Sequence, residues 1–249
     1  MSKKPILVLG DACIDRFVYC HCDRLCPDAP VPVLDVLHQE DSYGMAGNVV
    51  RNIDALGYPV TLICNPRCDE IIKSRYVDEK SNHMFLRIDT VLPPEPCEVL
   101  REIDWNTYGA VVIADYNKGF LTEEDIHFVG TQHPLTFLDT KKTLGAWAKS
   151  IKFIKINRKE YGLSRRYIDA DLESRIICTL GADGCRYRSN IYRVHEVEIK
   201  NLSGAGDSFL AGLVVKYLET DGDIDTSLQH ANKVATIVVQ KKGMATIKD

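Results

Sequence analysis

Apolar and polar positions along the chain follow two different periods, and these predict strands and helices in turn. Short apolar runs bounded by turn residues are typical of buried strands, whereas apolar residues three and four positions apart are typical of amphipathic helices. Before residue 90 the pattern predicts one helix, at 46–56, which Gly57 ends. The strands expected in this part are 5–10, 17–22, 31–38, 60–64, 75–77 and 84–88.

From residue 110 onward, strands and helices alternate. Strands are expected at 110–114, 135–138, 151–156, 176–180 and 185–188, and helices at 123–129, 144–149, 158–163 and from about 224 to 242. Another helix is expected after Gly206, because Phe209, Leu213 and Tyr217 share one face at helical spacing. This alternation predicts an α/β protein with helices on both faces of a mostly parallel sheet. Ligands bind such sheets at the carboxyl ends of the strands.

Composition narrows the class of protein. With 249 residues and 45% hydrophobic content, one well-cored domain with a small appendage is expected. The 31 basic and 35 acidic residues give a net charge of −4 without a dominant basic block, which argues against nucleic-acid and membrane partners. The apolar run 6–9 is too short for a signal peptide, and no apolar stretch could span a membrane. The nine cysteines are an odd number, so we expect reduced thiols in a cytoplasmic protein.

Four of the cysteines, with His21, lie within residues 13–26 and could form a zinc site. Their spacing is not that of a standard zinc finger or ribbon. Cys20 and Cys22 would also share one face of an ordinary strand, because strand side chains alternate. The structural interpretation is therefore favoured over a metal site.

The segment Gly204-Ala205-Gly206-Asp207 is the most informative for function. Its glycines allow a tight turn with bare N–H groups, and the predicted helix that follows places these groups at a helix N-terminus that favours a phosphate. A carboxylate beside such an anion site would repel the phosphate, so Asp207 needs another role. Accepting a proton from an attacking hydroxyl is the role that fits. A capped helix with a flexible entry is the alternative.

Polar residues also follow the ends of successive predicted strands. They are Asp11 and Asp15, Asp115 and Lys118, Asp139 and Lys141, and Asn157 and Glu160. A single aspartate in such a place is usually a turn former or helix cap. Asn157 and Glu160 could likewise form a capping box. Their recurrence in several units favours a binding site at this edge of the sheet.

Together these motifs resemble those of the ribokinase-like (PfkB) carbohydrate kinases. The resemblance implies a three-layer ribokinase-like sandwich, formed by a single domain over 1–249, with a central mostly parallel sheet and a small β-strand lid. The lid strands are expected as insertions at about 16–43 and 73–90, and lid pairing between two copies would give a homodimer. The resemblance also implies ATP and Mg²⁺ as cofactors and leaves a monovalent cation open.

The resemblance assigns roles to individual residues of this sequence. Asp207 is implied as general base, and Gly204, Ala205 and Gly206 as stabilising charge on the transferring phosphoryl group. The sugar is implied to contact Asp15, Gly44, Asn48, Asp115 and Lys118. The nucleotide is implied to contact Asn157, Glu160, Thr179, Gly181, Gly184, Asn232 and Gly243, with Asn157 and Glu160 also organising Mg²⁺ through water.

Within the family, the runs 10–33, 73–77, 86–89 and 115–119 look like the heptose-phosphate kinase branch. This implies phosphorylation of the anomeric hydroxyl of a heptose 7-phosphate. Lys73, Arg75 and Arg87 would suit an anionic sugar phosphate, although basic residues on solvated strand faces are the alternative.

The chain also departs from the family pattern. Met45 stands where the family has a second glycine, Asn201 and Ser203 replace the usual aspartate and threonine, and the segments 64–73 and 161–175 are shorter. Two other interpretations therefore stay open: a different sugar or nucleoside kinase, and a non-catalytic relative that binds a sugar or nucleotide.

Overall fold

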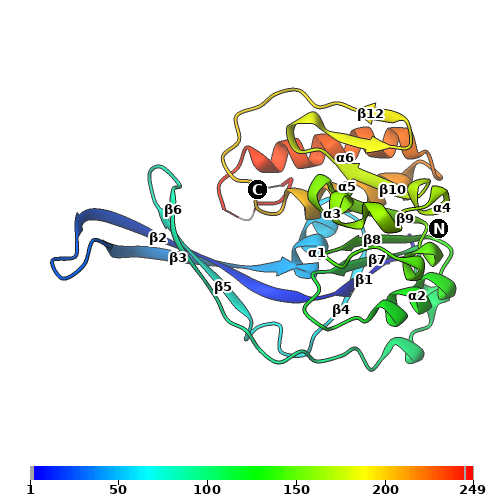
Figure 1. Ribbon diagram of the computed structural model, residues 1–249, viewed down its shortest axis with the longest axis horizontal. Coiled ribbons are helices and arrows are strands. Elements are labelled where there is room, and N and C mark those ends of the chain that lie inside the picture. The colour runs from blue at the N-terminus through cyan, green and yellow to red at the C-terminus, as the bar shows by residue number, and fades with distance from the viewer. Residues whose placement is uncertain (1–2, 244, 249) are drawn as a thin grey trace.

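The larger of two sheets has eight strands in the order β12-β11-β10-β9-β8-β7-β1-β4 in the computed structural model, which describes residues 3–243 and 245–248 (Figure 1). Neighbouring strands from β4 to β10 are parallel, whereas β10–β11 and β11–β12 are antiparallel. The strands are β1 (Ile6–Gly10), β4 (Val60–Cys64), β7 (Ala110–Asp115), β8 (Thr136–Thr140), β9 (Phe153–Asn157), β10 (Ile176–Thr179), β11 (Cys185–Tyr187) and β12 (Asn190–Tyr192).

Helices cover both faces of this sheet because its central strands are apolar on both sides. In β1, Ile6 and Val8 belong to one core and Leu7 and Leu9 to the other, as the alternation of strand side chains requires. The first core packs against α1 (Ala46–Ala55), α5 (Ala205–Glu219) and α6 (Ile224–Val239). The second packs against α2 (Glu123–Gln132), α3 (Arg158–Ser164) and α4 (Ala170–Glu173). This confirms the three-layer α/β fold.

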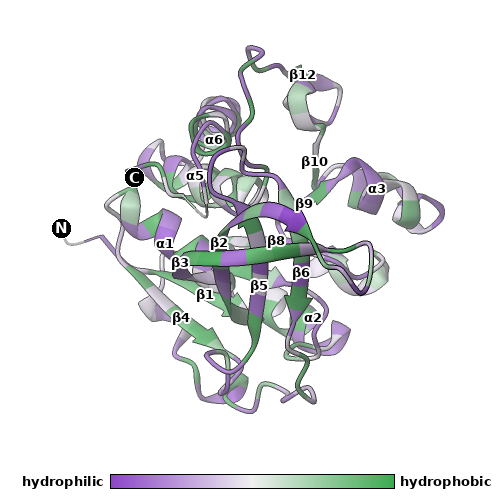
Figure 2. Ribbon diagram, turned by 90° about the vertical axis from the view of Figure 1, so that its left-hand side faces the viewer, coloured by the Kyte–Doolittle hydropathy of each residue, from purple (hydrophilic) through white to green (hydrophobic). Residues whose placement is uncertain are grey.

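The second sheet has four strands in the order β3-β2-β5-β6. They are β2 (Ala12–Leu25), β3 (Pro32–Met45), β5 (Ile72–Asp78) and β6 (Met84–Asp89). The β2–β3 pair projects from the body as a long arm (Figure 1), and polar and apolar residues both occur along the strands of this sheet (Figure 2). β1 leads into β2 through Asp11, and β3 passes directly into α1. The second sheet therefore begins at the carboxyl edge of the large sheet.

Most predicted elements are present, with shifted ends. β2 and β3 each span 14 residues and are longer than predicted, since antiparallel pairing continues through polar residues that carry no apolar signal. The short strand β12 was not predicted, and the helix expected at 144–149 is a 3-10 helix. The 3-10 helices are Leu100–Glu102, Trp105–Thr107, Ala146–Ser150, Arg165–Tyr167 and Gly181–Asp183. Within the described residues, no helix has the length and apolar character needed to cross a membrane.

Candidate active site

Asp207 lies in the first turn of α5, directly after the turn that starts this helix. Gly204 is the N-cap residue with φ of +79°, in the left-handed region that favours glycine. Asp207 is 5% exposed, and its carboxylate accepts a hydrogen bond from Asn48 Nδ2 at 2.8 Å and another from the Tyr116 hydroxyl. Burial raises the pKa of Asp207 to about 6, and these two hydrogen bonds oppose the rise. The carboxylate is thus held near the range where it can take up a proton.

Tyr116 lies in the run 115–119 that resembles the heptose-phosphate kinase branch, but it was not among the predicted site residues. Burial raises the pKa of its phenol well above the usual value, with the Asp207 charge as the next cause. The phenol therefore stays protonated and donates to Asp207. The backbone N–H of Tyr116 donates to Asp11 Oδ2 at 2.8 Å, and the backbone N–H of Lys118 donates to the same oxygen at 3.2 Å. Asp11 thereby shapes the loop that presents Tyr116.

Gly206 lies against a buried ion pair. A Cβ at this position would lie 2.7 Å from Lys155 Nζ. Lys155 projects from β9 and pairs with Asp139 of β8 at 2.6 Å, and both side chains are buried. Asp139 Oδ2 lies 4.0 Å from the same Cβ position, so the positive end of the pair is nearer to the glycine loop, where it would favour an anion. Sequence reasoning missed Lys155, although a lysine inside the apolar run of a buried strand was a usable signal.

Asn157 and Glu160 form the capping box that the alternative interpretation expected. Asn157 Oδ1 accepts from the Glu160 backbone N–H at 2.9 Å, and Glu160 Oε2 accepts from the Asn157 N–H at 2.8 Å. Glu160 Oε1 also pairs with Lys141 Nζ at 2.5 Å, and Lys141 Nζ lies 3.7 Å from Asp139 Oδ1. The cap orients a carboxylate toward the edge of the site, so capping does not preclude ligand contact.

The donors in this region fit Mg²⁺. Glu160 and Asn157 offer hard oxygen atoms, and Asp139 Oδ1 is buried without a hydrogen-bond partner. In the described part of the chain, no group of three or more His, Cys, Asp and Glu side chains is arranged to hold a metal by itself. Mg²⁺ usually keeps its waters and binds through one or two carboxylates together with ligand phosphates. The residues therefore suit Mg²⁺ that arrives with a phosphate.

A cavity of about 370 Å³, the charged cavity, opens in front of Asp207. It lies between the second sheet, the loop after β7 and the start of α5. Its lining residues are Asp15, Met45, Lys73, Arg75, Arg87, Asp89, Tyr116, Lys118, Lys141, Ser203, Gly204 and Asp207. Gly44 lies behind Asp15, and a Cβ there would come within 2.1 Å of Asp15 Oδ2. Asp115 does not line this cavity, because its carboxylate accepts from Thr140 Oγ1 and Lys142 Nζ instead.

The three basic residues expected at an anionic sugar differ in their pairing. Arg75 is buried and pairs with Asp15, while Arg87 forms a bidentate pair with Asp89 at 2.7 and 2.8 Å. Lys73 is buried, and its Nζ lies 5.6 Å from the ring centre of Tyr116. Two of the three charges are thus neutralised by carboxylates within the protein.

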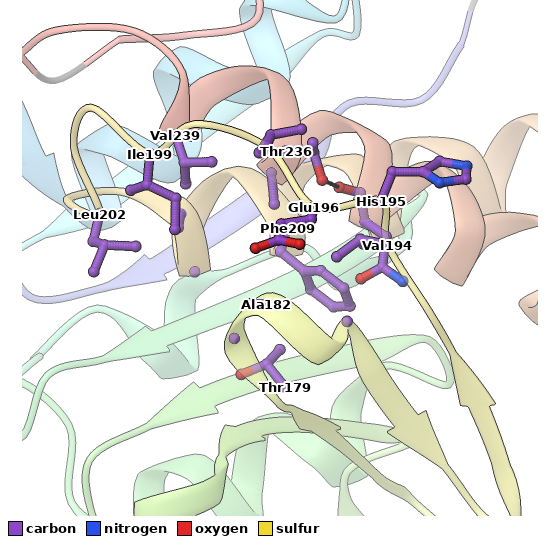
Figure 3. Close-up of a pocket in the computed structure, with 17 residues that line it drawn as sticks. Thr179, Ala182, Val194, His195, Glu196, Ile199, Leu202, Phe209, Thr236 and Val239 are labelled. Carbon is purple, nitrogen blue, oxygen red and sulfur yellow. Dashed lines mark hydrogen bonds between the residues drawn. The ribbon is translucent and has the colours of Figure 1, made fainter.

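A second cavity of about 260 Å³, the apolar cavity, is lined by Ala205, Gly206 and Phe209 of α5. Figure 3 shows its lining side chains. Four of the predicted nucleotide contacts line this cavity: Thr179, Gly181, Gly184 and Asn232. Gly243 does not line it. Gly243 instead accepts a hydrogen bond at its carbonyl from Asn201 Nδ2. The side chains of Val194, Ile199, Leu202, Phe209 and Val239 form much of its wall (Figure 3). Sequence reasoning missed the 194–202 contribution, because this segment has no regular period.

The sequence is similar to those of known carbohydrate kinases. Residues 136–249 match the pfkB family of carbohydrate kinases. The chain is 30% identical over 295 residues to the bifunctional protein HldE of Nitratiruptor sp., covering 98% of this chain and 63% of that protein. It is 29% identical over 301 residues to the D-beta-D-heptose 7-phosphate kinase of Bordetella bronchiseptica, covering 99% of this chain and 94% of that relative. The chain thus spans less than two thirds of the HldE protein.

Solved structures support the fold. The phosphofructokinase-2 of Escherichia coli in complex with potassium superposes with a TM-score of 0.72 at 14% identity, covering 98% of this chain and 95% of that one. A nucleoside kinase of Methanocaldococcus jannaschii, an archaeal member of the ribokinase family, gives 0.70 at 16% identity, covering 97% and 93%. At such identities the likeness concerns the fold alone. The sequence matches thus relate residues 136–249 to the pfkB family of carbohydrate kinases, and the superpositions show that the chain has the ribokinase-like fold.

Proposed function

We propose that this protein is an ATP-dependent sugar kinase that transfers the γ-phosphoryl group to the anomeric hydroxyl of a heptose 7-phosphate. One observation carries the proposal. The start of α5 lies between two cavities, with Gly204 and Asp207 lining the charged cavity and Ala205 and Gly206 lining the apolar cavity. A phosphate at the glycine loop would therefore meet an acceptor beside Asp207.

The residues around the start of α5 would have distinct roles in the transfer. Asp207 takes the proton of the acceptor hydroxyl while the hydroxyl oxygen bonds to the γ-phosphorus and the bond to the ADP oxygen breaks. The loop amides and Lys155 stabilise the charge on the transferring group. Asn48 and the Tyr116 phenol orient the carboxylate through their hydrogen bonds. Bound Mg²⁺, held through Asn157 and Glu160, would neutralise phosphate charge.

The apolar cavity would take the adenine of ATP. Its walls are mainly aliphatic and aromatic, which suits a flat base, and Asn232 and Thr179 add polar groups. A coupled assay of ATP consumption with and without Mg²⁺ tests the cofactor, and a K⁺ titration of the same assay tests the monovalent cation. ATP turnover without Mg²⁺ would contradict this assignment.

Heptose 7-phosphate is proposed as the substrate because of the similarity to a D-beta-D-heptose 7-phosphate kinase and because of the lysines in the charged cavity. Lys73 and Lys118 line the charged cavity, and neither has a carboxylate partner among the residues the structure describes. A second candidate, a kinase of uncharged sugars or nucleosides, is favoured by the neutralisation of Arg75 and Arg87. Activity on heptose 7-phosphate, free heptose, ribose, fructose and adenosine separates the two. Equal activity on heptose with and without the phosphate favours the second.

We also propose that two copies pair through the second sheet as a lid. Seven large apolar side chains on its strands are at least 47% exposed, more than an isolated sheet of this kind tolerates. They are Leu25, Val36, Leu37, Tyr43, Met84, Leu86 and Ile88. Light scattering at micromolar concentration is expected to give the mass of a dimer, and a monomer mass would refute this pairing.

A further inference from the structure

A third cavity, the side cavity of about 270 Å³, adjoins the charged cavity. The two have Met45, Lys73, Asp89 and Lys118 in common, so they adjoin at these residues. Neither Asp207 nor the glycine loop lines the side cavity. A molecule with its reacting hydroxyl at Asp207 would therefore reach the side cavity with its opposite end.

Asn65, directly after β4, lines this cavity and carries a hydrogen-bond donor without a partner among the described residues. The residue is 7% exposed, and its Oδ1 accepts from the Ala12 backbone N–H at 2.7 Å. This bond fixes the orientation of the amide, because the opposite orientation would set two donors against each other. Nδ2 is then buried with no partner within the described part of the chain. Buried donors are rarely left unpaired, so this group points to a ligand oxygen.

The side cavity is lined by three basic and three acidic residues, and basic residues exceed acidic ones by one when Arg87, the partner of Asp89, is counted. Arg67 pairs with Glu95 at 2.8 Å, and Asp89 pairs with Arg87. The carboxylate of Asp11 accepts three backbone N–H groups, from Tyr116, Lys118 and Phe120. Lys73 and Lys118 are the lysines of the lining, and neither has a carboxylate partner in the described residues. The surplus favours an anionic end on the bound molecule.

Met45 lies at the junction of the two cavities. It is 4% exposed and has φ of +56°, a backbone conformation that side-chain-bearing residues adopt at a cost. It lines both cavities and so lies where they adjoin. Met45 therefore contributes to the shape of the site where the two cavities meet.

We propose that the acceptor site continues past Met45 into the side cavity, where Asn65 donates a hydrogen bond to the anionic, oxygen-bearing far end of the acceptor. The inference rests on the proposed kinase function and adds the residues that select the acceptor. Asn65 and Lys118 contribute to binding of the acceptor and not to the transfer step.

Asn65→Asp is the most direct test, because it keeps the oxygen that accepts from Ala12 and replaces only the unpaired donor. Asn117→Asp is the matched control, since Asn117 lines the same cavity but is exposed, at a positive φ that aspartate tolerates. Lys118→Gln is a second variant at an exposed residue, which keeps the proposal testable if Asn65→Asp fails to fold.

The measurement is kcat and KM for heptose 7-phosphate at saturating ATP. Loss of a charge-assisted hydrogen bond is expected to raise this KM about tenfold in Asn65→Asp and Lys118→Gln, with kcat within about twofold. The control is expected to change KM less than about threefold, because Asn117 is exposed and no hydrogen bond or charge contact with the acceptor is assigned to it. The KM for ATP is expected to stay the same in every variant.

Three results would overturn the inference: an unchanged KM in Asn65→Asp, an equal rise in Asn117→Asp, or a fall in kcat with KM preserved. In each of these the wild-type protein is active, so the proposed function stands. A wild-type protein that phosphorylates no sugar would overturn the proposed function and this inference with it.

Discussion

Replacing Tyr116 by phenylalanine tests how the structure sets the basicity of Asp207. The Tyr116 hydroxyl donates to Asp207 Oδ1, and this bond lowers a pKa that burial raises to about 6. Phenylalanine fills the same space but cannot donate. The ionised carboxylate then loses one of two stabilising bonds, while its burial is unchanged.

The size of the effect follows from the hydrogen bond. A bond to a charged group contributes roughly 1.5–3 kcal/mol, which corresponds to about one to two pKa units. The acid limb of kcat/KM, expected near pH 6 in the wild-type protein, should therefore move to about pH 7–8 in Tyr116→Phe. The sign is definite: a raised pKa means that less of the base is ionised at pH 6–7. Activity should fall most at low pH and recover in alkaline buffer.

The assay is kcat/KM for the acceptor from pH 5 to 9. Tyr167→Phe serves as the control, because Tyr167 is 47% exposed and lies outside the charged cavity. It should leave the limb in place. An acid limb that stays near pH 6 in Tyr116→Phe would refute the reasoning, as would a loss of activity that is equal at every pH.

Three further variants test other parts of the site. Asp207→Asn should lower kcat by about 10²–10⁴ with little change in the ATP Kd by calorimetry, and undiminished turnover would exclude Asp207 as the base. Gly44→Ala sets a methyl group 2.1 Å from Asp15 Oδ2 and should raise the acceptor KM, so an unaltered KM would place the acceptor elsewhere. Gly184→Ala, at φ of +88° and 2.0 Å from the Tyr192 carbonyl oxygen, should lower Tm and weaken ATP binding, which thermal melts and calorimetry measure.

The local pattern of the chain was sufficient for most of the fold. The strand predicted at 60–64 has the observed bounds of β4, because a short apolar run between turn residues is a local signal. The start of α5 at the glycine loop could be predicted for the same reason, as could the capping box of Asn157 and Glu160. These features depend on residues that are close in sequence.

The partners of the site residues were not predictable in this way. Asp207 meets Asn48, 159 residues away, and Tyr116, 91 residues away. The pairing of Arg75 with Asp15 and the burial of the Asn65 amide also join distant segments.

The amino-acid sequence by itself determined the alternation of strands and helices, the anion-binding loop and the carboxylate beside it. Only the tertiary structure decided which charges are already neutralised, how basic Asp207 is, and where an unpaired donor lies. The physical reason is that a pKa and a hydrogen bond depend on burial and on neighbours in space. Strand order and the attachment of the second sheet determine burial and spatial neighbours. The apolar periodicity of the sequence predicts neither of them.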